Sequence, residues 1–186
     1  MAEDARFETI VDMLRNNARL YRDETALVEI NPDRSEDRRV DWREYNLVEI
    51  TTDKPYRREM TWGVFDEKAN RFANLLISRG ICKGDKVAIL LYNCIEWLPI
   101  YFGVLKSGAT VVPLNFRYAA DEIAYCLDKS DANVLLFGSE FRERIEEILP
   151  QAQPYRLLFY VGDDCPEWAE SYQELTSFCL SSDPEV

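Results

Sequence analysis

Four short apolar runs follow one another at a regular interval along the chain. They begin at residues 87, 110, 133 and 156, 23 residues apart, and read VAILL, TVVPL, NVLLF and RLLFY. Because their apolar residues are continuous rather than alternating with polar ones, these runs are typical of strands buried on both faces of a sheet. The segments between them have helical patterns, at Glu96–Ser107, Ala120–Lys129 and Glu140–Leu149. This alternation predicts parallel strands joined by right-handed crossovers, and hence a layered α/β fold with a largely parallel sheet flanked by helices.

The part before residue 61 has a different pattern. Apolar residues on one face of a 3.6-residue period predict a helix over Phe7–Leu20, and a short strand is expected over Thr25–Ile30. Two further runs, Tyr45–Thr51 and Tyr56–Thr61, flank the turn sequence TDKP and predict a β-hairpin. We therefore expect an N-terminal helix, a strand and a hairpin added to the α/β fold.

The helix that leads into the first of the four runs has signals at both ends. Thr61 is a good capping residue for a helix over Trp62–Arg79, and Gly80 supplies the left-handed conformation that ends it. Two later helix starts are less well defined, because Ala119 has no side-chain acceptor and Pro99 removes a backbone donor.

The segment after the last apolar run is acidic. One helix is expected there, over Trp168–Phe178, followed by the linker sequence SSDP and a frayed end. These patterns divide the chain into an N-terminal elaboration over residues 1–60, an α/β subdomain over residues 61–162, and an acidic C-terminal helix and linker over residues 163–186.

Composition narrows the class of protein. With 186 residues, 47% of them apolar, the chain is long enough for one compact domain with a substantial core. No apolar run reaches the length of a membrane-spanning helix, and the acidic start MAEDARFETIVDML lacks the features of a secretory signal. We therefore expect a cytoplasmic protein without a transmembrane segment.

The five cysteines are widely spaced and odd in number, so we expect small buried hydrophobic side chains rather than disulfides.

Several functions are excluded by the net charge, by the absence of histidine and by the spacing of the acidic residues. The net charge of −12 repels nucleic acid. No histidine is present, which excludes a Ser-His-Asp triad, a Cys-His pair and a histidine-containing zinc site built by this chain alone. Asp163 and Asp164 are adjacent, but no third ligand stands nearby, so we expect a solvated turn there and no metal site.

In open parallel sheets, ligands bind beyond the carboxyl ends of the strands. The residues at these ends form no catalytic set, and Asn93 is expected to cap a helix together with Glu96. Arg117 is the charge of most interest, because it follows a strand, stands between two aromatic residues and is suited to holding a phosphate. Two alternatives stay open for Arg117, namely stacking on a neighbouring ring and pairing with Asp121.

The sequence from Gly103 to Gly108 has the spacing of a phosphate-binding loop but not its chemistry. Such a loop places a lysine directly after the second glycine, whereas Ala109 stands there and Lys106 comes too early. Gly103 also falls inside a helical pattern. Gly108 is better explained as the turn from a helix into a strand.

Four segments together resemble a known family. They are DEKANRFANLLISRGI, KGDKVAILLYNCIEW, YFGVLKSGATVVPLNFRY and DEIAYCLDKSDANVLLF. In this order and at these separations they look like the opening blocks of the adenylate-forming superfamily, which includes acyl- and aryl-CoA synthetases, luciferases and the adenylation domains of peptide synthetases. The resemblance implies a two-step ligase, in which an acid and ATP give an acyl-adenylate that CoA then converts to an acyl-CoA.

The resemblance also implies functional motifs that these 186 residues do not contain. The family's Ser/Thr/Gly-rich phosphate loop ending in Lys, its Thr-Glu pair near Mg²⁺, its ribose-binding Asp and its mobile C-terminal Lys have no counterpart here. We therefore expect the N-terminal subdomain of an acid–CoA ligase for a fatty or other acyl acid. Its full-length parent would use ATP, Mg²⁺ and CoA, whereas this chain alone would bind none of them and would be inactive, with no catalytic residues of its own.

One residue role follows from the resemblance. In similar CoA ligases, the arginine after the corresponding strand lies near the CoA nucleotide, which implies a contact between Arg117 and a CoA phosphate. Phe116 and the pair Ala119-Ala120 depart from the family pattern, and this weakens the transfer of the role.

Other interpretations stay open beside the ligase. A non-catalytic α/β interaction module is the main alternative, and a small nucleotide- or flavin-binding domain is less favoured because no glycine-rich fingerprint is present. The partners expected for a ligase subdomain are the remaining subdomains of the parent enzyme and a small acid substrate. Surface that packs on those subdomains would be exposed here, so self-association is expected through Trp97, Tyr101 and Phe102.

Overall fold

A computed structural model describes residues 8–30, 57–132, 134–150 and 157–185 of the chain. Its central feature is a five-stranded sheet in which all neighbouring strands are parallel. The strand order is β4-β3-β5-β6-β7. The strands are β3 (Lys86–Leu90), β4 (Thr110–Pro113), β5 (Val134–Gly138), β6 (Leu157–Val161) and β7 (Glu170–Ser171). The predicted layered α/β fold and all four predicted strands are confirmed.

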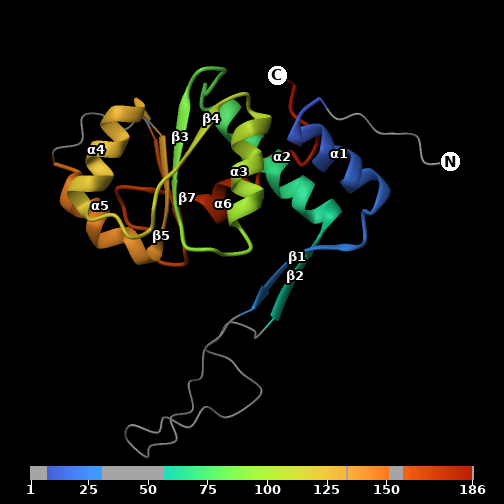
Figure 1. Ribbon diagram of the computed structural model, residues 1–186, viewed down its shortest axis with the longest axis horizontal. Helices are drawn as coiled ribbons and strands as arrows, with labels where there is room; N and C mark the ends of the chain where they lie inside the picture. The colour runs from blue at the N-terminus through green and yellow to red at the C-terminus, as the bar shows by residue number, and fades with distance from the viewer. Residues whose placement is uncertain (1–7, 31–56, 133, 151–156, 186) are drawn as a thin grey trace, which may run out of the picture.

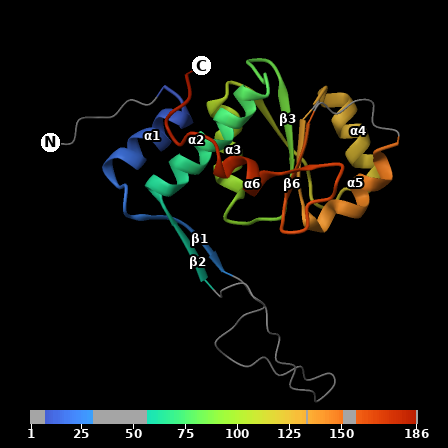
Figure 2. The ribbon, with the colours of Figure 1, turned by 180° about the vertical axis from the view of Figure 1, so that it is seen from behind.

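Helices cover both faces of this sheet. On one face lie α2 (Trp62–Ser78), α3 (Trp97–Lys106) and α6 (Tyr172–Ser177), whose buried side chains form one apolar cluster with β3, β5 and β6. On the other face lie α4 (Ala120–Ser130) and α5 (Arg142–Ile148), which form a second cluster. Figures 1 and 2 show the two helical layers on opposite sides of the strands.

The strands differ in burial in a way that the apolar runs did not predict. All five residues of β5 are buried, as expected for a strand covered on both faces. β4 is instead an edge strand whose four residues are half-buried or exposed. Pro113 lies in β4, and a proline is tolerated at an edge because it has no N–H to donate to a further strand. The expectation that the run TVVPL is buried on both faces is therefore wrong.

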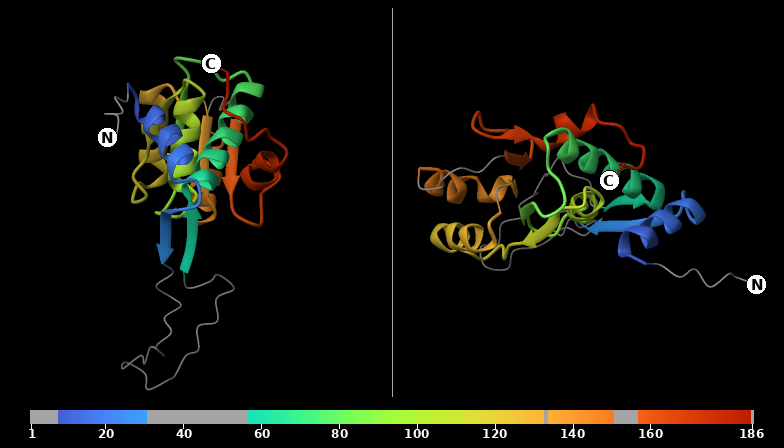
Figure 3. Two further views of the ribbon diagram at one scale, coloured as in Figure 1. Left: turned by 90° about the vertical axis from the view of Figure 1, so that its right-hand side faces the viewer. Right: turned by 90° about the horizontal axis from the view of Figure 1, so that it is seen from above.

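The N-terminal elements are a helix and a two-stranded antiparallel sheet. The helix α1 (Ile10–Leu20) begins after Thr9, whose hydroxyl accepts a hydrogen bond from the backbone N–H of Asp12 at 3.1 Å. Strand β2 (Arg57–Thr61) pairs with β1 (Thr25–Ile30), and Figure 3 shows the pair extending from the body. Within the described residues, the partner of β2 is thus the earlier strand. The other predicted hairpin strand, 45–51, lies outside them.

Two predicted capping signals of α2 are confirmed. The hydroxyl of Thr61 accepts a hydrogen bond from the backbone N–H of Val64 at 3.3 Å, and Gly80 follows the helix with a φ of 75°. Gly108 likewise has a φ of 81° where α3 turns into β4. These positive φ angles favour glycine because it has no Cβ to clash with the backbone.

Of three other helix starts, that of α4 at Ala120 is as predicted and two differ from expectation. Asn93 does not cap α3, which begins after Glu96 without a side-chain cap. The carboxylate of Glu96 accepts hydrogen bonds from Arg58. The weak start at Ala119 is supported by Glu122, which accepts the Ala119 N–H at 2.9 Å. The helix expected over residues 140–149 is divided into a 3₁₀ turn, Ser139–Phe141, and α5.

The last part of the chain is the least well predicted. The helix expected over Trp168–Phe178 is shorter, because Glu170 and Ser171 pair with β6 as a fifth parallel strand before α6 begins. Ser171 then caps α6 by accepting a hydrogen bond from the Glu174 N–H at 3.2 Å. A strand of two residues is too short to leave a pattern in the sequence, so this error has a simple cause.

The cysteines also differ from expectation. Cys94, Cys126, Cys165 and Cys179 are free thiols. However, Cys82 is exposed and the other four are half-buried, so none is a fully buried core residue. Burial, reinforced by the charge of Glu96, raises the pKa of the Cys94 thiol to about 11.

Candidate functional site at the carboxyl ends of the strands

The topology of the sheet singles out one place for a ligand. β3 and β5 are neighbours, although the chain visits β4 between them. The helix after β3 covers one face of the sheet, and the helix after β5 covers the other. Chain segments therefore leave the carboxyl ends of these two strands in opposite directions, and such a switch point is where open α/β sheets bind ligands.

Each of the three strands around this point supplies an aromatic side chain. Tyr92 follows β3, Phe116 follows β4, and Phe141 follows β5. The ring centroid of Tyr92 lies 5.3 Å from that of Phe116 and 5.1 Å from that of Phe141. Phe141 is fully buried, whereas Tyr92 and Phe116 are 43% and 41% exposed. The cluster thus has a buried base and an exposed aromatic rim.

Arg117 lies on this rim, as the sequence predicts. It is exposed, and its guanidinium carbon lies 5.4 Å from the ring centroid of Phe116. Its backbone N–H donates to the side-chain oxygen of Asn115 at 3.0 Å. Among the described residues, no carboxylate forms an ion pair with Arg117, so the alternative of pairing with Asp121 is not what the structure shows. Stacking on a ring leaves the guanidinium N–H groups available to a ligand.

Arg144 on α5 was not predicted. Its guanidinium donates to the backbone carbonyls of Phe116 and Tyr118 at 2.9 and 3.0 Å, and it lies 5.5 Å from the ring centroid of Phe141. Arg144 therefore fixes the backbone on both sides of Arg117. No sequence signal could have identified it, because an arginine on the polar side of a helix is usually solvated.

Gly138 allows a close approach at the same edge. A Cβ on this residue would lie 2.5 Å from a carboxylate oxygen of Glu140 and 3.1 Å from a methyl carbon of Leu91. The missing side chain lets Glu140 fold back over the end of β5. We define the carboxyl-edge cluster as Tyr92, Phe116, Arg117, Phe141 and Arg144, in which two guanidinium groups lie against aromatic rings. It has no nucleophile paired with a base.

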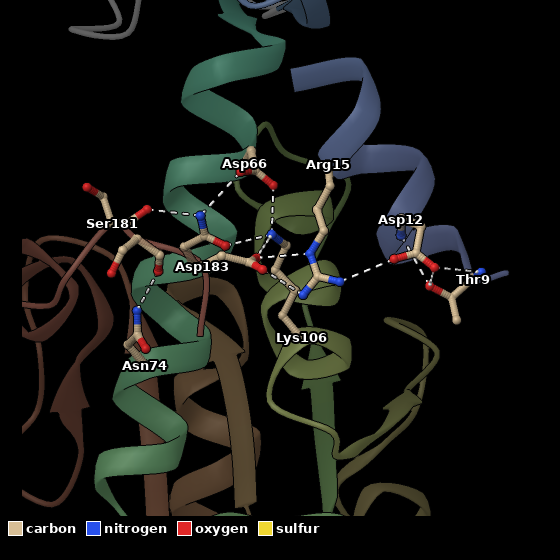
Figure 4. Close-up of polar contacts among 10 residues, drawn as sticks. Thr9, Asp12, Arg15, Asp66, Asn74, Lys106, Ser181 and Asp183 are labelled. Atoms are coloured by element: carbon tan, nitrogen blue, oxygen red, sulfur yellow. Dashed lines mark hydrogen bonds and ion pairs between the residues drawn. The ribbon is translucent and has the colours of Figure 1, made fainter. Parts of the chain in front are cut away.

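A second charged region lies where α1, α2, α3 and the end of the chain meet. The side chain of Lys106 on α3 is fully buried, and its ammonium donates to Asp66, Asn70 and Asp183 at 2.7, 2.6 and 2.8 Å. Arg15 on α1 joins the same carboxylate of Asp183 at 2.8 Å (Figure 4). We refer to Lys106, Asp66, Asn70 and Asp183 as the tail clamp. Lys106 is thus a structural lysine, and the phosphate-loop interpretation set aside above has no support.

The tail clamp and its neighbours hold the end of the chain in place. Asn70 donates to the carbonyl of Ser181 at 2.9 Å, and Asn74 donates to the carbonyls of Leu180 and Ser182 at 2.9 and 3.0 Å. Burial opposes ionisation of Asp183, but hydrogen bonds from Lys106 and Arg15 outweigh it and lower the pKa of that carboxyl. The expected frayed end is therefore wrong for the described part of the tail, because side chains from three helices bind it.

Comparison with known proteins places these features in a family. The family model described as AMP-binding enzyme matches residues 14–179. The chain belongs to this family. It is 34% identical over 129 residues to a medium/long-chain-fatty-acid–CoA/3-oxocholest-4-en-26-oate–CoA ligase of Mycolicibacterium smegmatis, and the match covers 68% of this chain and 23% of that protein. It is also 38% identical over 107 residues to the long-chain-fatty-acid–CoA ligase FadD13 of Mycobacterium tuberculosis, covering 58% of this chain and 20% of that protein.

Solved structures of the family share the fold. The anthranilate CoA ligase AuaEII in complex with anthranoyl-AMP superimposes with a TM-score of 0.76 and 25% identity, over 95% of this chain and 29% of that one. The N-terminal domain of FACL13 from Mycobacterium tuberculosis gives a TM-score of 0.71 and 28% identity, over 97% of this chain and 38% of that one. The family member described here thus spans only about a quarter of its curated relatives, 23% of the one from Mycolicibacterium smegmatis.

Two expectations about the surface can be compared with the structure. None of the described helices is long and apolar enough to span a membrane. The residues expected to form an exposed apolar patch do not, because Phe102 is buried and Trp97 and Tyr101 are half-buried against neighbouring helices. The most exposed large apolar side chains are Phe178, Leu180 and Tyr125.

Proposed function

We propose that this chain is the N-terminal subdomain of an ATP-dependent carboxylic acid–CoA ligase. The observation that carries the proposal is its 34% identity over 129 residues to a protein named as a fatty-acid–CoA ligase, within a family match over residues 14–179. The names of the relatives favour a fatty acid or another acyl acid as the substrate. A cytoplasmic location, where ATP and CoA are available, is part of the proposal.

The reaction proposed for the full-length parent has two steps. A carboxylate oxygen of the acid attacks the α-phosphorus of ATP, and pyrophosphate leaves to give an acyl-adenylate. The sulfur of CoA then attacks the acyl carbon, AMP leaves, and the thiol proton is released. ATP, Mg²⁺ and CoA are thus reactants and cofactors of the parent.

The part of this chemistry assigned to the described residues is binding. We propose that Arg117 contacts a phosphate of the CoA nucleotide, with Arg144 positioning the backbone that carries it. The exposed guanidinium at the switch point, stacked on Phe116 and without a carboxylate partner among the described residues, supports this role. Because the family's phosphate loop and its catalytic lysine have no counterpart in the 186 residues, the chain alone is proposed to be inactive.

ATP–pyrophosphate exchange tests the inactivity directly. The purified chain, supplied with ATP, Mg²⁺ and a medium- or long-chain fatty acid, is expected to give no acid-dependent exchange, whereas the relative from Mycolicibacterium smegmatis serves as the positive control. Acid-dependent exchange by this chain would show that the inactivity is wrong.

A chimera separates the ligase proposal from the alternative of a non-catalytic interaction module. The chain replaces the matching segment of the same relative, and the circular dichroism of the chimera establishes that it is folded. A folded chimera with exchange activity supports the ligase subdomain, and a folded chimera without it favours the interaction module.

In the active chimera, Arg117→Gln is expected to raise the KM for CoA about tenfold, because one charge-assisted hydrogen bond is lost. The KM for ATP should stay unchanged, as it should in the control Arg142→Gln.

A further inference from the structure

A crevice of about 340 Å³ is lined by residues of α2 and α6 and has no role in the proposal above. Its walls are one side of α2, the side chain of Glu96 after β3, and the polar side of α6. The carboxyl-edge cluster contributes none of these residues. The volume lies within the range of small-molecule sites in proteins.

The buried hydroxyl of Tyr172 is the first sign of a ligand there. Tyr172 lines the crevice, is only 3% exposed, and its ring packs edge-on against Phe72 with the centroids 5.3 Å apart. Among the described residues, no group forms a hydrogen bond with its hydroxyl. Burial, with further contributions from Glu96 and Cys94, raises the pKa of Tyr172, so the hydroxyl keeps its proton and is a donor. Because buried donors in native proteins nearly always have an acceptor, this one points to an acceptor supplied from outside the chain.

The balance of charge is the second sign. Lys68 is half-buried in the crevice wall, and none of the described carboxylates forms an ion pair with it. Arg71 donates to the backbone carbonyls of Ser177 and Cys179 at 3.1 and 2.6 Å, so its charge is not neutralised by an acid. The wall therefore carries two cations for which the described part of the chain supplies no counter-ion.

The two acids of the wall already have partners. Glu67 pairs with Arg22 at 2.5 Å, and Glu96 pairs with Arg58 at 3.1 Å. Both carboxylates nevertheless remain close to the crevice and would repel an incoming anion. The attraction to Lys68 and Arg71 grows in the same proportion, so charge alone does not select a singly charged ligand over a phosphate. The apolar side chain of Val64 instead favours a ligand that carries an aliphatic chain.

We propose that this crevice binds the carboxylate of a small organic acid. The ammonium of Lys68 supplies the opposite charge, and the hydroxyl of Tyr172 donates a hydrogen bond to a carboxylate oxygen. Val64 forms the apolar part of the wall, which suits a short aliphatic chain. The inference concerns binding by this chain and does not depend on ligase activity.

A titration of the ¹⁵N-labelled chain with sodium butyrate tests the proposal. Sodium chloride keeps the ionic strength constant, and amide shifts are followed by NMR. We expect saturable shifts confined to α2 and α6, with a Kd on the order of 1 mM, since a ligand of few atoms has limited binding energy. Tyr172→Phe and Lys68→Gln should each weaken binding about tenfold, as expected when one hydrogen bond or ion pair to a charged group is lost.

Matched controls keep the outcome interpretable. Tyr125→Phe and Lys129→Gln change the same residue types on exposed parts of α4, where Tyr125 is 63% exposed, and should leave the Kd unchanged. Tyr172→Phe should not lower the melting temperature without ligand, because the removed hydroxyl has no partner among the described residues.

Four results would overturn the inference. They are an absence of saturable shifts, shifts that neither crevice variant weakens, tighter binding of inorganic phosphate than of butyrate, and a clear loss of stability in Tyr172→Phe without ligand. The last result would show that the hydroxyl has a structural role, such as binding an internal water molecule.

Discussion

The tail clamp and the carboxyl-edge cluster both place a cation among residues from several elements, but they use it differently. Lys106 is fully buried, and its ammonium donates to three acceptors within 2.8 Å. Arg117 is exposed, lies over an aromatic ring, and keeps guanidinium donors that no described carboxylate accepts. A cation whose donors are all satisfied inside the chain contributes to stability, whereas one with donors left over is available for binding.

The largest effect is expected from Lys106→Met. Removing the ammonium leaves Asp66, Asn70 and Asp183 without their shared donor, and the loss of one member of a buried ion pair is strongly destabilising. We expect the free energy of unfolding to fall by about 3 kcal/mol, the lower end of the range for such changes, because Asp183 is half-exposed and regains water. Urea unfolding followed by circular dichroism measures it.

Lys129→Met is the matched control for this prediction. Lys129 is 62% exposed, pairs with its neighbour Asp128 and lies 5.6 Å from the ring centroid of Tyr125. Because these contacts are on the surface, its loss should change the free energy of unfolding by less than about 0.5 kcal/mol. Equal effects of the two substitutions would remove the distinction between a buried structural cation and a solvated one.

The next largest effect is expected from Gly103→Ala, which tests the packing beside the tail clamp. A Cβ on Gly103 would lie 2.9 Å from two atoms of the Phe72 side chain and 3.0 Å from the carbonyl oxygen of Ala69. Alanine favours a helix by up to about 1 kcal/mol over glycine, but overpacking α3 against α2 outweighs this gain. We expect a net loss of about 2 kcal/mol in urea unfolding.

Gly138→Ala, beside the carboxyl-edge cluster, is the substitution with which the effect of Gly103→Ala is compared. Its added Cβ meets mainly the end of the flexible Glu140 side chain, which can swing away. The expected loss is therefore smaller, about 1 kcal/mol or less. If Gly103→Ala costs no more than Gly138→Ala, then close helix packing is not the reason for the glycine at position 103.

The sequence was sufficient to predict the elements whose burial is uniform. The continuous apolar run of β5 and the capping residue Thr61 depend on local physical chemistry, so both were found. The strand β7 was not predicted, because a strand of two residues leaves no periodic signal. The docking of the tail was not predicted either, because the tail is held by side chains more than 70 positions away, as Asp183 is held by Lys106.

In the two charged regions, too, the sequence predicted a residue's role only where the signal was local. Arg117 was found because a strand end followed by an aromatic and an arginine is a local pattern. Arg144 and Lys106 were missed because their roles depend on which distant groups the fold brings to them. Arg144 binds carbonyls 26 and 28 residues away, and the burial of Lys106 depends on α1, α2 and the tail together.

A smaller, pH-dependent effect is expected at Asp183. Its folded-state pKa is lowered by Lys106 and Arg15 despite partial burial, so its ionised form stabilises the folded chain. This contribution is fully present above the unfolded-state pKa of about 3.9 and is lost as the pH falls through the lower folded-state value. Asp183→Asn should therefore reduce the free energy of unfolding by about 1 kcal/mol near pH 6, a modest value because the side chain is 46% exposed.

The measurement is the difference in free energy of unfolding between the two proteins at a series of pH values. The difference should stay constant above about pH 5 and shrink as the pH is lowered below about 4. A difference that does not change between pH 3 and 7 would mean that the charge of Asp183 does not stabilise the clamp.

The smallest effects are expected within the carboxyl-edge cluster, and they test the assignment of its two arginines. Arg144→Gln removes hydrogen bonds to the carbonyls of Phe116 and Tyr118, so we expect a loss of about 1 kcal/mol in urea unfolding. Arg117→Gln removes only an exposed group stacked on a ring, and less than about 0.5 kcal/mol should be lost. The reverse order would make Arg117 the structural arginine. Its donors would then not be available to a ligand, and the proposed contact with a CoA phosphate would lose its physical basis.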